Sequence, residues 1–292
     1  MTGSRDRYVG LATGLTYHVV EWDGPADRTF VLVHGFSDLG RGWEPVAELL
    51  APHGRVIAPD LRGHGDSDRV GAGGYYHFMD YVADLDDVIA RCATGEVVLV
   101  GHSMGGSIAG YWAGTRPDRL ARLVLLEGLG PPDLAAVDPV ARTAMWIDAW
   151  KAARTKPAFR AMASIDIAIA RLRKNDPRLD ETTARRLAEV GTRAVTGGIT
   201  WKHDPLHMTG GPYVYRLAVA SEFWRRVTCP VLVVDGAEST LNLPHVERAA
   251  RRAMFAHCRH VVVPDAGHAL QRHQPAHVAR LILEHAGITP AA

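Results

Sequence analysis

The first 130 residues alternate between short apolar runs and longer stretches in which apolar residues recur at helical spacing. The apolar runs are continuous, which is typical of strands that are buried on both faces of a parallel sheet. They cover residues 28–33, 55–59, 96–100 and 120–126. Helical spacing is clearest over residues 76–91 and 104–115. This order of elements predicts an α/β protein with a mostly parallel sheet that is covered by helices.

The same alternation resumes after residue 226. Two further strands are expected at residues 231–234 and 261–263. Helices are expected at residues 245–256, directly after Pro244, and at residues 277–285. The C-terminal part of the chain therefore returns to the sheet-and-helix pattern of the N-terminal part.

The segment between these two parts has a different pattern. Residues 131–222 form helix-like stretches with no convincing strand, and turn-forming residues lie at both ends of the segment. We therefore expect an α/β core formed by residues 1–130 and 223–292, with residues 131–222 inserted as a helical cap.

Charge and composition narrow the class of protein. The 33 basic and 32 acidic residues give a net charge of +1, so we expect neither a nucleic-acid partner nor a membrane partner. Cys92, Cys229 and Cys258 lack C-x-x-C spacing, which argues against a disulfide scaffold or a zinc site. Residues 1–10 are polar and charged, which predicts neither a signal peptide nor an anchor. We expect a cytoplasmic monomer or homodimer.

The strongest chemical signal is the sequence GHSMG at residues 101–105. It lies between a predicted strand and a predicted helix, which is the setting of the nucleophile elbow G-x-S-x-G. In this sharp turn, glycines on both sides make room for a strained serine. Ser103 is therefore the candidate nucleophile, with the N-terminus of a helix behind it to favour developing negative charge.

A serine hydroxyl is a poor nucleophile, so it requires a general base. Of the 15 histidines, His268 lies just after the last predicted strand, where the order serine, acid, histidine of this elbow type places the base. His34 and His102 occupy glycine-flanked turns, and we expect them to form structural hydrogen bonds. His273 and His277 have metal-like spacing without the glutamate of H-E-x-x-H, so no metal site is expected.

An acyl intermediate also requires donors for its oxyanion. The strand at residues 28–33 continues into His-Gly-Phe at residues 34–36. We expect the backbone N–H groups of Phe36 and Met104 to form the oxyanion hole.

These motifs, together with DLRGHGDS at residues 60–67, make residues 8–288 resemble the α/β-hydrolase family of serine esterases and their relatives. The resemblance implies an eight-stranded, mostly parallel sheet flanked by helices, a helical cap over the active site and no cofactor. It is specific for the fold and for serine chemistry, and it says little about the substrate.

The acid departs from the family's usual pattern. The position that usually carries it, three residues after Gly236, is Ser239. A subset of the family places the acid after the strand that follows the elbow helix, and this strand ends at Glu127. Glu127 is therefore the first candidate, with Glu238 and Asp235 as alternatives. Glu127 could instead be a strand-end carboxylate that pairs with an arginine of the cap.

The identity of the candidate nucleophile, Ser103, narrows the classes of reaction that the protein is expected to catalyse. A serine argues against the dehalogenase and epoxide hydrolase reactions, which in this family use an aspartate. We expect a carboxylesterase-like enzyme that cleaves a small-molecule acyl substrate, a carboxylic ester or a thioester or lactone, through an acyl-enzyme. The alternatives are a carbon–carbon bond hydrolase and a weakly catalytic ligand-binding protein on the same fold.

The cap offers candidate substrate contacts. Trp146 and Trp150 could form an apolar roof over the nucleophile, although large aromatic side chains of this kind are more often packed in a core. A turn-rich segment ending in WKHDP at residues 201–205 resembles one that closes the cap in related serine-hydrolase-like proteins, and its His203 is a further candidate contact.

Overall fold

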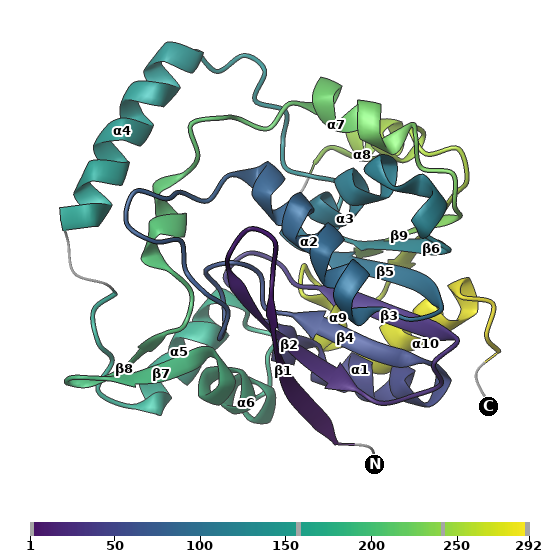
Figure 1. The fold of residues 1–292 in the computed structure, drawn as a ribbon, viewed down its shortest axis with the longest axis horizontal. Helices are drawn as coiled ribbons and strands as arrows, with labels where there is room; N and C mark the ends of the chain where they lie inside the picture. Colours follow the sequence, from purple (N-terminus) through teal and green to yellow (C-terminus); the bar gives the residue numbers. More distant parts are fainter. Residues whose placement is uncertain (1–2, 156–158, 241–242, 290–292) are drawn as a thin grey trace.

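The computed structural model describes residues 3–155, 159–240 and 243–289. Within these ranges, no helix combines the length and the apolar character needed to cross a lipid bilayer. The two layers of helices and the sheet between them are visible in Figure 1.

The sheet has eight strands in the order β1-β2-β4-β3-β5-β6-β9-β10, and it confirms the predicted fold class. The pairs β1–β2 and β2–β4 are antiparallel, whereas the remaining pairs are parallel. The strands are β1 (Ser4–Gly10), β2 (Thr16–Trp22), β3 (Arg28–Val33), β4 (Arg55–Pro59), β5 (Glu96–His102), β6 (Arg122–Leu126), β9 (Val231–Gly236) and β10 (Cys258–Val263).

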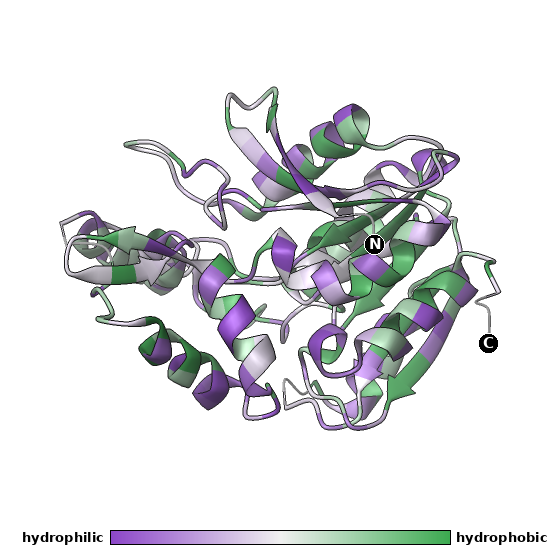
Figure 2. Cartoon of the chain, turned by 90° about the horizontal axis from the view of Figure 1, so that it is seen from below, coloured by the Kyte–Doolittle hydropathy of each residue, from purple (hydrophilic) through white to green (hydrophobic). Residues whose placement is uncertain are grey.

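Helices cover both faces of the sheet because side chains of each central strand alternate between two apolar cores. Val31 and Leu99 face the core formed with α2, α3 and α7, whereas Leu32 and Val98 face the core formed with α1 and α10. Figure 2 shows the resulting green, apolar strands at the centre. The helices of these layers are α1 (Glu44–Leu50), α2 (Phe78–Cys92), α3 (Met104–Thr115), α7 (Leu217–Trp224), α8 (His245–Arg252), α9 (Leu270–His273) and α10 (Pro275–His285).

The segment inserted between β6 and α7 contains both helices and strands. The expectation of a segment without strands is wrong, since β7 and β8 form an antiparallel hairpin. Their turn uses Gly197 and Gly198 at positive φ. The elements of the insert are α4 (Pro139–Thr155), α5 (Ile165–Asn175), α6 (Glu181–Gly191), β7 (Thr192–Val195), β8 (Gly198–Trp201) and the 3-10 helix η4 (Pro205–Thr209).

The insert has a small apolar core of its own. Met162 is buried between the hairpin and α5, where Ala168 and Ile169 lie, and Leu187 of α6 completes the cluster. Helix α4 has no buried residue and extends away from this cluster, as Figure 1 shows. The last predicted residues of the cap, by contrast, belong to α7, which packs against α3.

Candidate active site

Ser103 sits at a strained turn between β5 and α3. Its φ of 53° and ψ of −117° lie outside the regions that non-glycine residues normally adopt. A Cβ atom at Gly101 would lie 2.4 Å from the carbonyl oxygen of Gly105, and one at Gly105 would lie 2.3 Å from that of Val33. Both glycines of the motif are therefore required by the close approach of backbone atoms.

The loop after β3 lies directly beside this turn. A Cβ atom added to Gly35 would be 3.2 Å from the Cβ atom of Ser103. Phe36 and Met104 line the same cavity as Ser103. Within the described chain, the backbone N–H groups of Phe36 and Met104 have no hydrogen-bond acceptor. Two free donors therefore lie at the position where the sequence predicts the oxyanion hole.

Two histidines hold the loops around Ser103. His34 donates from Nδ1 to the carbonyl oxygen of Gly35 at 2.7 Å and accepts at Nε2 from the N–H of Leu61 at 2.9 Å. His102 donates from Nε2 to the carbonyl oxygen of His268 at 2.8 Å. Burial, with a contribution from the neighbouring His268, lowers the pKa of His102 to about 3. Both side chains make the structural hydrogen bonds expected of them.

His268 and Glu127 meet at the end of the sheet. His268 follows β10, and Glu127 directly follows β6 in a left-handed conformation with φ of 49°. The Nδ1 atom of His268 lies 3.5 Å from Oε2 of Glu127. This separation exceeds a hydrogen bond but is within the range of an ion pair, and catalytic contacts are often longer in the absence of substrate.

The carboxylate of Glu127 is held by the loop after β9. Its Oε1 atom accepts from the N–H of Gly236 at 2.7 Å, and its Oε2 atom accepts from the hydroxyl of Ser239 at 2.8 Å. Ser239 occupies the position where the family usually has its acid, so this loop supplies hydrogen-bond donors to the carboxylate that follows β6. In the described chain, Glu127 forms no ion pair with an arginine of the insert.

The two alternative acids have other partners. Asp235 pairs with Nε2 of His260 at 2.9 Å and lies 3.5 Å from Arg248. Glu238 pairs with Arg178 of the insert and is 44% exposed. Within the described residues, neither carboxylate contacts His268, whereas Glu127 does.

A cavity of about 1040 Å³ lies above these groups. Ser103, His268 and Glu127 line it, together with apolar and aromatic side chains from α2 and α3 and segments on both sides of α4 and η4. Its volume is at the upper end of the range for sites that bind drug-sized molecules.

His207 of η4 lines this cavity, although the sequence analysis did not single it out. Its ring centroid lies 3.7 Å from that of Tyr76 and 4.3 Å from that of His64, and the Phe36 ring is 5.9 Å away. Burial is the main cause that lowers the pKa of His207 to about 4. A neutral histidine of the insert therefore packs on the loop that carries the oxyanion donor.

The WKHDP segment fastens the insert to the core. Asp204 accepts from the hydroxyl of Tyr76 at 2.8 Å, and its N–H donates to the carbonyl oxygen of Gly63 at 2.7 Å. Lys202 pairs with Asp66 at 2.6 Å. His203 does not line the cavity that contains Ser103, nor the second pocket described below. Its ring lies near those of Phe159 and Trp201. Burial, together with the charge of Arg69, lowers its pKa to about 4.

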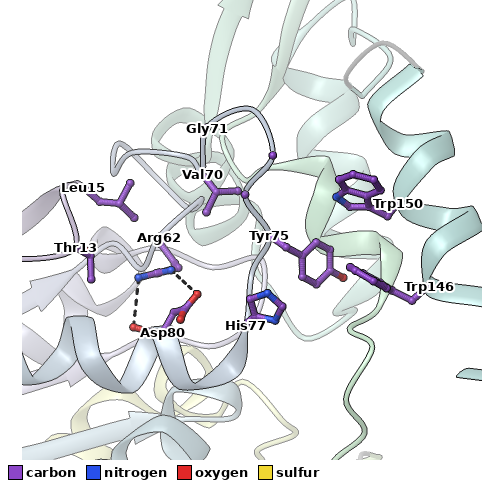
Figure 3. A pocket seen from close by; sticks show the side chains of 12 residues that line it. Thr13, Leu15, Arg62, Val70, Gly71, Tyr75, His77, Asp80, Trp146 and Trp150 are labelled. Atoms are coloured by element: carbon purple, nitrogen blue, oxygen red, sulfur yellow. Dashed lines mark hydrogen bonds and ion pairs between the residues drawn. The ribbon is translucent and has the colours of Figure 1, made fainter. Parts of the chain in front are cut away.

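Trp146 and Trp150 do not line the cavity that contains Ser103. They form one wall of a second pocket of about 490 Å³, shown in Figure 3, where an ion pair between Arg62 and Asp80 lies opposite them. This pocket shares Tyr75 and His77 with the main cavity. The two tryptophans are thus adjacent to the candidate active site but separated from its nucleophile.

The side chains of His18, Asp60 and Asp66 come close enough to suggest a metal site. Both ring nitrogens of His18 are already bound, however, Nδ1 to Asp60 at 2.7 Å and Nε2 to Asp6 at 2.8 Å. Asp60 also accepts from the N–H groups of Gly40 and Asp66. The cluster is therefore a satisfied hydrogen-bond network between β1, β2 and the loop after β4.

Comparison with known proteins identifies the family. Residues 28–273 match the family described as alpha/beta hydrolase fold, and the chain belongs to it. A 3-hydroxybutyrate-oligomer hydrolase from Cupriavidus necator is 32% identical over 275 residues, which cover 91% of this chain and 90% of the relative.

Solved structures of similar proteins also support membership of this family. A thioesterase domain from the curacin biosynthetic pathway superposes with a TM-score of 0.86 at 26% identity, covering 96% of this chain and 99% of that one. A thermophilic esterase from Thermogutta terrifontis superposes with a TM-score of 0.66 at 26% identity, covering 96% and 97%. The family and these relatives support a hydrolase.

Proposed function

We propose that the protein is a serine hydrolase that cleaves a carboxylic ester, or a related thioester or lactone, through an acyl-enzyme. One observation carries the proposal: Ser103 is strained at a glycine-flanked elbow and shares a cavity with His268, whose Nδ1 atom lies 3.5 Å from the carboxylate of Glu127. Three similar proteins support it, because an oligomer hydrolase, a thioesterase and an esterase are all named for hydrolysis.

In the first half-reaction, the Oγ atom of Ser103 attacks the acyl carbonyl carbon while Nε2 of His268 accepts its proton. The N–H groups of Phe36 and Met104 bind the oxyanion, and Glu127 stabilises the imidazolium. The tetrahedral intermediate then expels the alcohol, or thiol, which takes the proton from His268. Ser103 is left as an acyl ester.

In the second half-reaction, water attacks the acyl ester and His268 accepts a proton from the water. A second tetrahedral intermediate collapses, the carboxylic acid leaves, and the proton returns to Ser103. Glu127, whose two oxygens accept from Gly236 and Ser239, orients the imidazole in both half-reactions.

Covalent labelling tests this proposal. A fluorophosphonate should form an adduct on Ser103 that mass spectrometry locates, and Ser103→Ala should lower kcat for p-nitrophenyl butyrate by at least about 1000-fold. Ser164→Ala, at an exposed serine of the insert, serves as the control and should retain labelling. An unlabelled wild-type enzyme that hydrolyses no ester would favour the ligand-binding alternative.

A further inference from the structure

The cavity above Ser103 contains two arginines whose charge is not balanced by an acidic residue. Arg142 of α4 and Arg216, directly before α7, both line it. Among the described lining residues, Glu127 is the one carboxylate, and the Gly236 N–H and the Ser239 hydroxyl already occupy its oxygens. Within the described chain, neither arginine forms an ion pair with a carboxylate.

The guanidinium group of Arg142 is fixed in place through one of its nitrogens. Its Nε atom donates to the carbonyl oxygen of Gly211 at 2.8 Å. Its Nη2 atom lies against Gly210, where a Cβ atom would be 2.8 Å away. No acceptor in the described chain binds the terminal nitrogens Nη1 and Nη2. The fork that normally binds a carboxylate is therefore ordered but unoccupied by a protein group.

Several arginines of the insert that lie outside the cavity are paired with carboxylates. Arg186 of α6 lies 3.0 Å from Glu44, and Arg185 lies 3.5 Å from Asp166. Neither of these arginines lines the cavity. Arg142 and Arg216 are the arginines that line the cavity among the described residues, and neither has a carboxylate partner there.

The surroundings of Arg142 and Arg216 strengthen their attraction for an anion. The neighbouring lining side chains are mostly prolines, tyrosines and aliphatic residues, which reduce access of water and lower the local dielectric constant. Arg142 is half-buried and Arg216 is exposed, so the guanidinium of Arg142 gains more from a bound carboxylate than one on an open surface does.

We propose that Arg142 and Arg216 form an anion subsite that binds a carboxylate of the substrate at the end remote from the scissile ester carbonyl. This inference rests on the proposed function, because Ser103 defines where the ester lies. The cavity of about 1040 Å³ is larger than a short simple ester needs, so it has room for a chain that reaches from Ser103 to the arginines.

Paired esters test the subsite. One pair compares the p-nitrophenyl monoester of adipic acid with p-nitrophenyl hexanoate, so that the carboxylate is on the acyl side. A second pair compares butyrate esters of 3-hydroxybutyrate and of its uncharged amide, so that the carboxylate is on the alcohol side. The wild-type enzyme should prefer the charged member of at least one pair in kcat/KM, mainly through a lower KM.

Variants at the two arginines should remove this preference. The ratio of kcat/KM for the charged ester to that for the neutral ester should fall about tenfold in Arg142→Ala and in Arg216→Ala, and about 100-fold in the double variant. Arg142→Glu should reverse the preference. Lys151→Ala, which removes an exposed charge from the same helix α4, is the matched control and should keep the wild-type ratio.

Two results would overturn the subsite. A wild-type enzyme that hydrolyses both members of each pair equally well has no anion preference, and an equal loss on charged and neutral esters in the arginine variants indicates a structural role. Calorimetry that measures adipate binding to the Ser103→Ala variant tests the anion subsite without requiring ester hydrolysis, so it separates the subsite from the proposed function. Adipate binding that is lost in Arg142→Ala would support the subsite even if no ester were hydrolysed, whereas absence of binding would contradict it.

Discussion

At the scale of single residues, the position proposed for the acid is explained by two neighbouring strands. Strands β6 and β9 are adjacent and parallel, so their C-terminal ends meet beside His268. Glu127 directly follows β6, and Ser239 lies in the loop after β9. Because the side chains of the two residues are 2.8 Å apart, a carboxylate from either position can reach nearly the same place.

This geometry predicts that the acid can be moved between the two strands. Glu127→Ser should lower kcat by at least about 1000-fold, because the imidazolium loses its charged partner. Adding Ser239→Asp to Glu127→Ser should recover at least about tenfold of that loss, since the new carboxylate can accept from the serine at 127. Steady-state kinetics on p-nitrophenyl butyrate measure both effects.

The other candidate acid provides the control for this exchange. Asp235→Asn should leave kcat within about threefold of the wild type, because the carboxylate of Asp235 is paired with His260 and lies near Arg248 and Arg252. A larger loss in Asp235→Asn than in Glu127→Ser would assign the acid to β9. Activity that survives Glu127→Ser unchanged would remove Glu127 from the mechanism.

At the scale of elements, α3 is shaped by the helix that packs on it. A Cβ atom at Gly114 would lie 2.1 Å from the carbonyl oxygen of Phe223, and one at Gly110 would lie 2.8 Å from the indole nitrogen of Trp224. These glycines let α7 approach the backbone of α3 closely. The approach explains why the residues of α7 that the sequence places in the cap, up to residue 222, pack on the core.

Gly114→Ala should therefore destabilise the protein, even though alanine has the higher intrinsic helix propensity by about 1 kcal/mol. The added methyl group must separate α3 from α7, and overpacking of this kind typically costs about 1–3 kcal/mol. Urea unfolding followed by circular dichroism measures the change in the free energy of unfolding. Gly191→Ala at the end of α6 is the control, because its added Cβ atom meets no atom closer than 3.8 Å. Equal stability of the two variants would contradict this account of the contact.

The elements that sequence predicts best are those with a complete local pattern. The four predicted core strands of the N-terminal part are present, and β3 and β4 have the predicted ends, because continuous apolar runs are required wherever both faces are buried. The hairpin β7–β8 escaped prediction because its strands have four residues each and most of β7 is exposed, so no alternation is visible. The exposed edge strand β1 gave no clear signal for a similar reason.

In the candidate site, too, residues that belong to local motifs are predictable from the sequence, whereas residues brought together by the tertiary fold are not. The elbow and the position of His268 follow from local motifs, and the order along the chain suggests Glu127. The lining of the cavity depends on how the insert folds back over the core, which no local pattern encodes. Arg142, Arg216 and His207 share a cavity with Ser103 through this arrangement, and helical spacing alone does not reveal that Trp146 lines the neighbouring pocket.

At the scale of the whole molecule, the half-buried His203 and His207 of the insert lie where it contacts the core, and His64 and His102 of the core are buried. Burial is the main cause that lowers the pKa of His203 and of His207 to about 4, and the pKa of His64 lies well below its usual value for the same reason. His102, with a pKa of about 3, lies beneath the loop that carries His268. All four are therefore neutral in the folded protein at pH 7.

His18 has the opposite effect on the pH dependence of stability, because its pKa is raised. Burial lowers its pKa, but hydrogen bonds and charges of Asp60 and Asp6 outweigh burial and raise the pKa overall. A raised pKa contributes stability that is present below the unfolded value of about 6.5 and is lost as pH rises through the folded pKa. His18 therefore opposes these four histidines and also His285, whose pKa is lowered mainly by burial.

Acidification should consequently destabilise the fold, and the histidines at the junction should contribute much of the effect. Below pH 6.5 the unfolded chain binds protons at these four histidines that the folded protein does not bind, so the free energy of unfolding decreases as pH falls from about 6.5 to about 4. Urea unfolding at several pH values across this window measures the slope. His207→Phe, which preserves ring packing on Tyr76, should make the slope shallower, whereas His257→Gln at an exposed position should leave it unchanged. Stability that stays constant from pH 7 to pH 4.5, or an unaltered slope in His207→Phe, would show that the junction does not depend on neutral histidines.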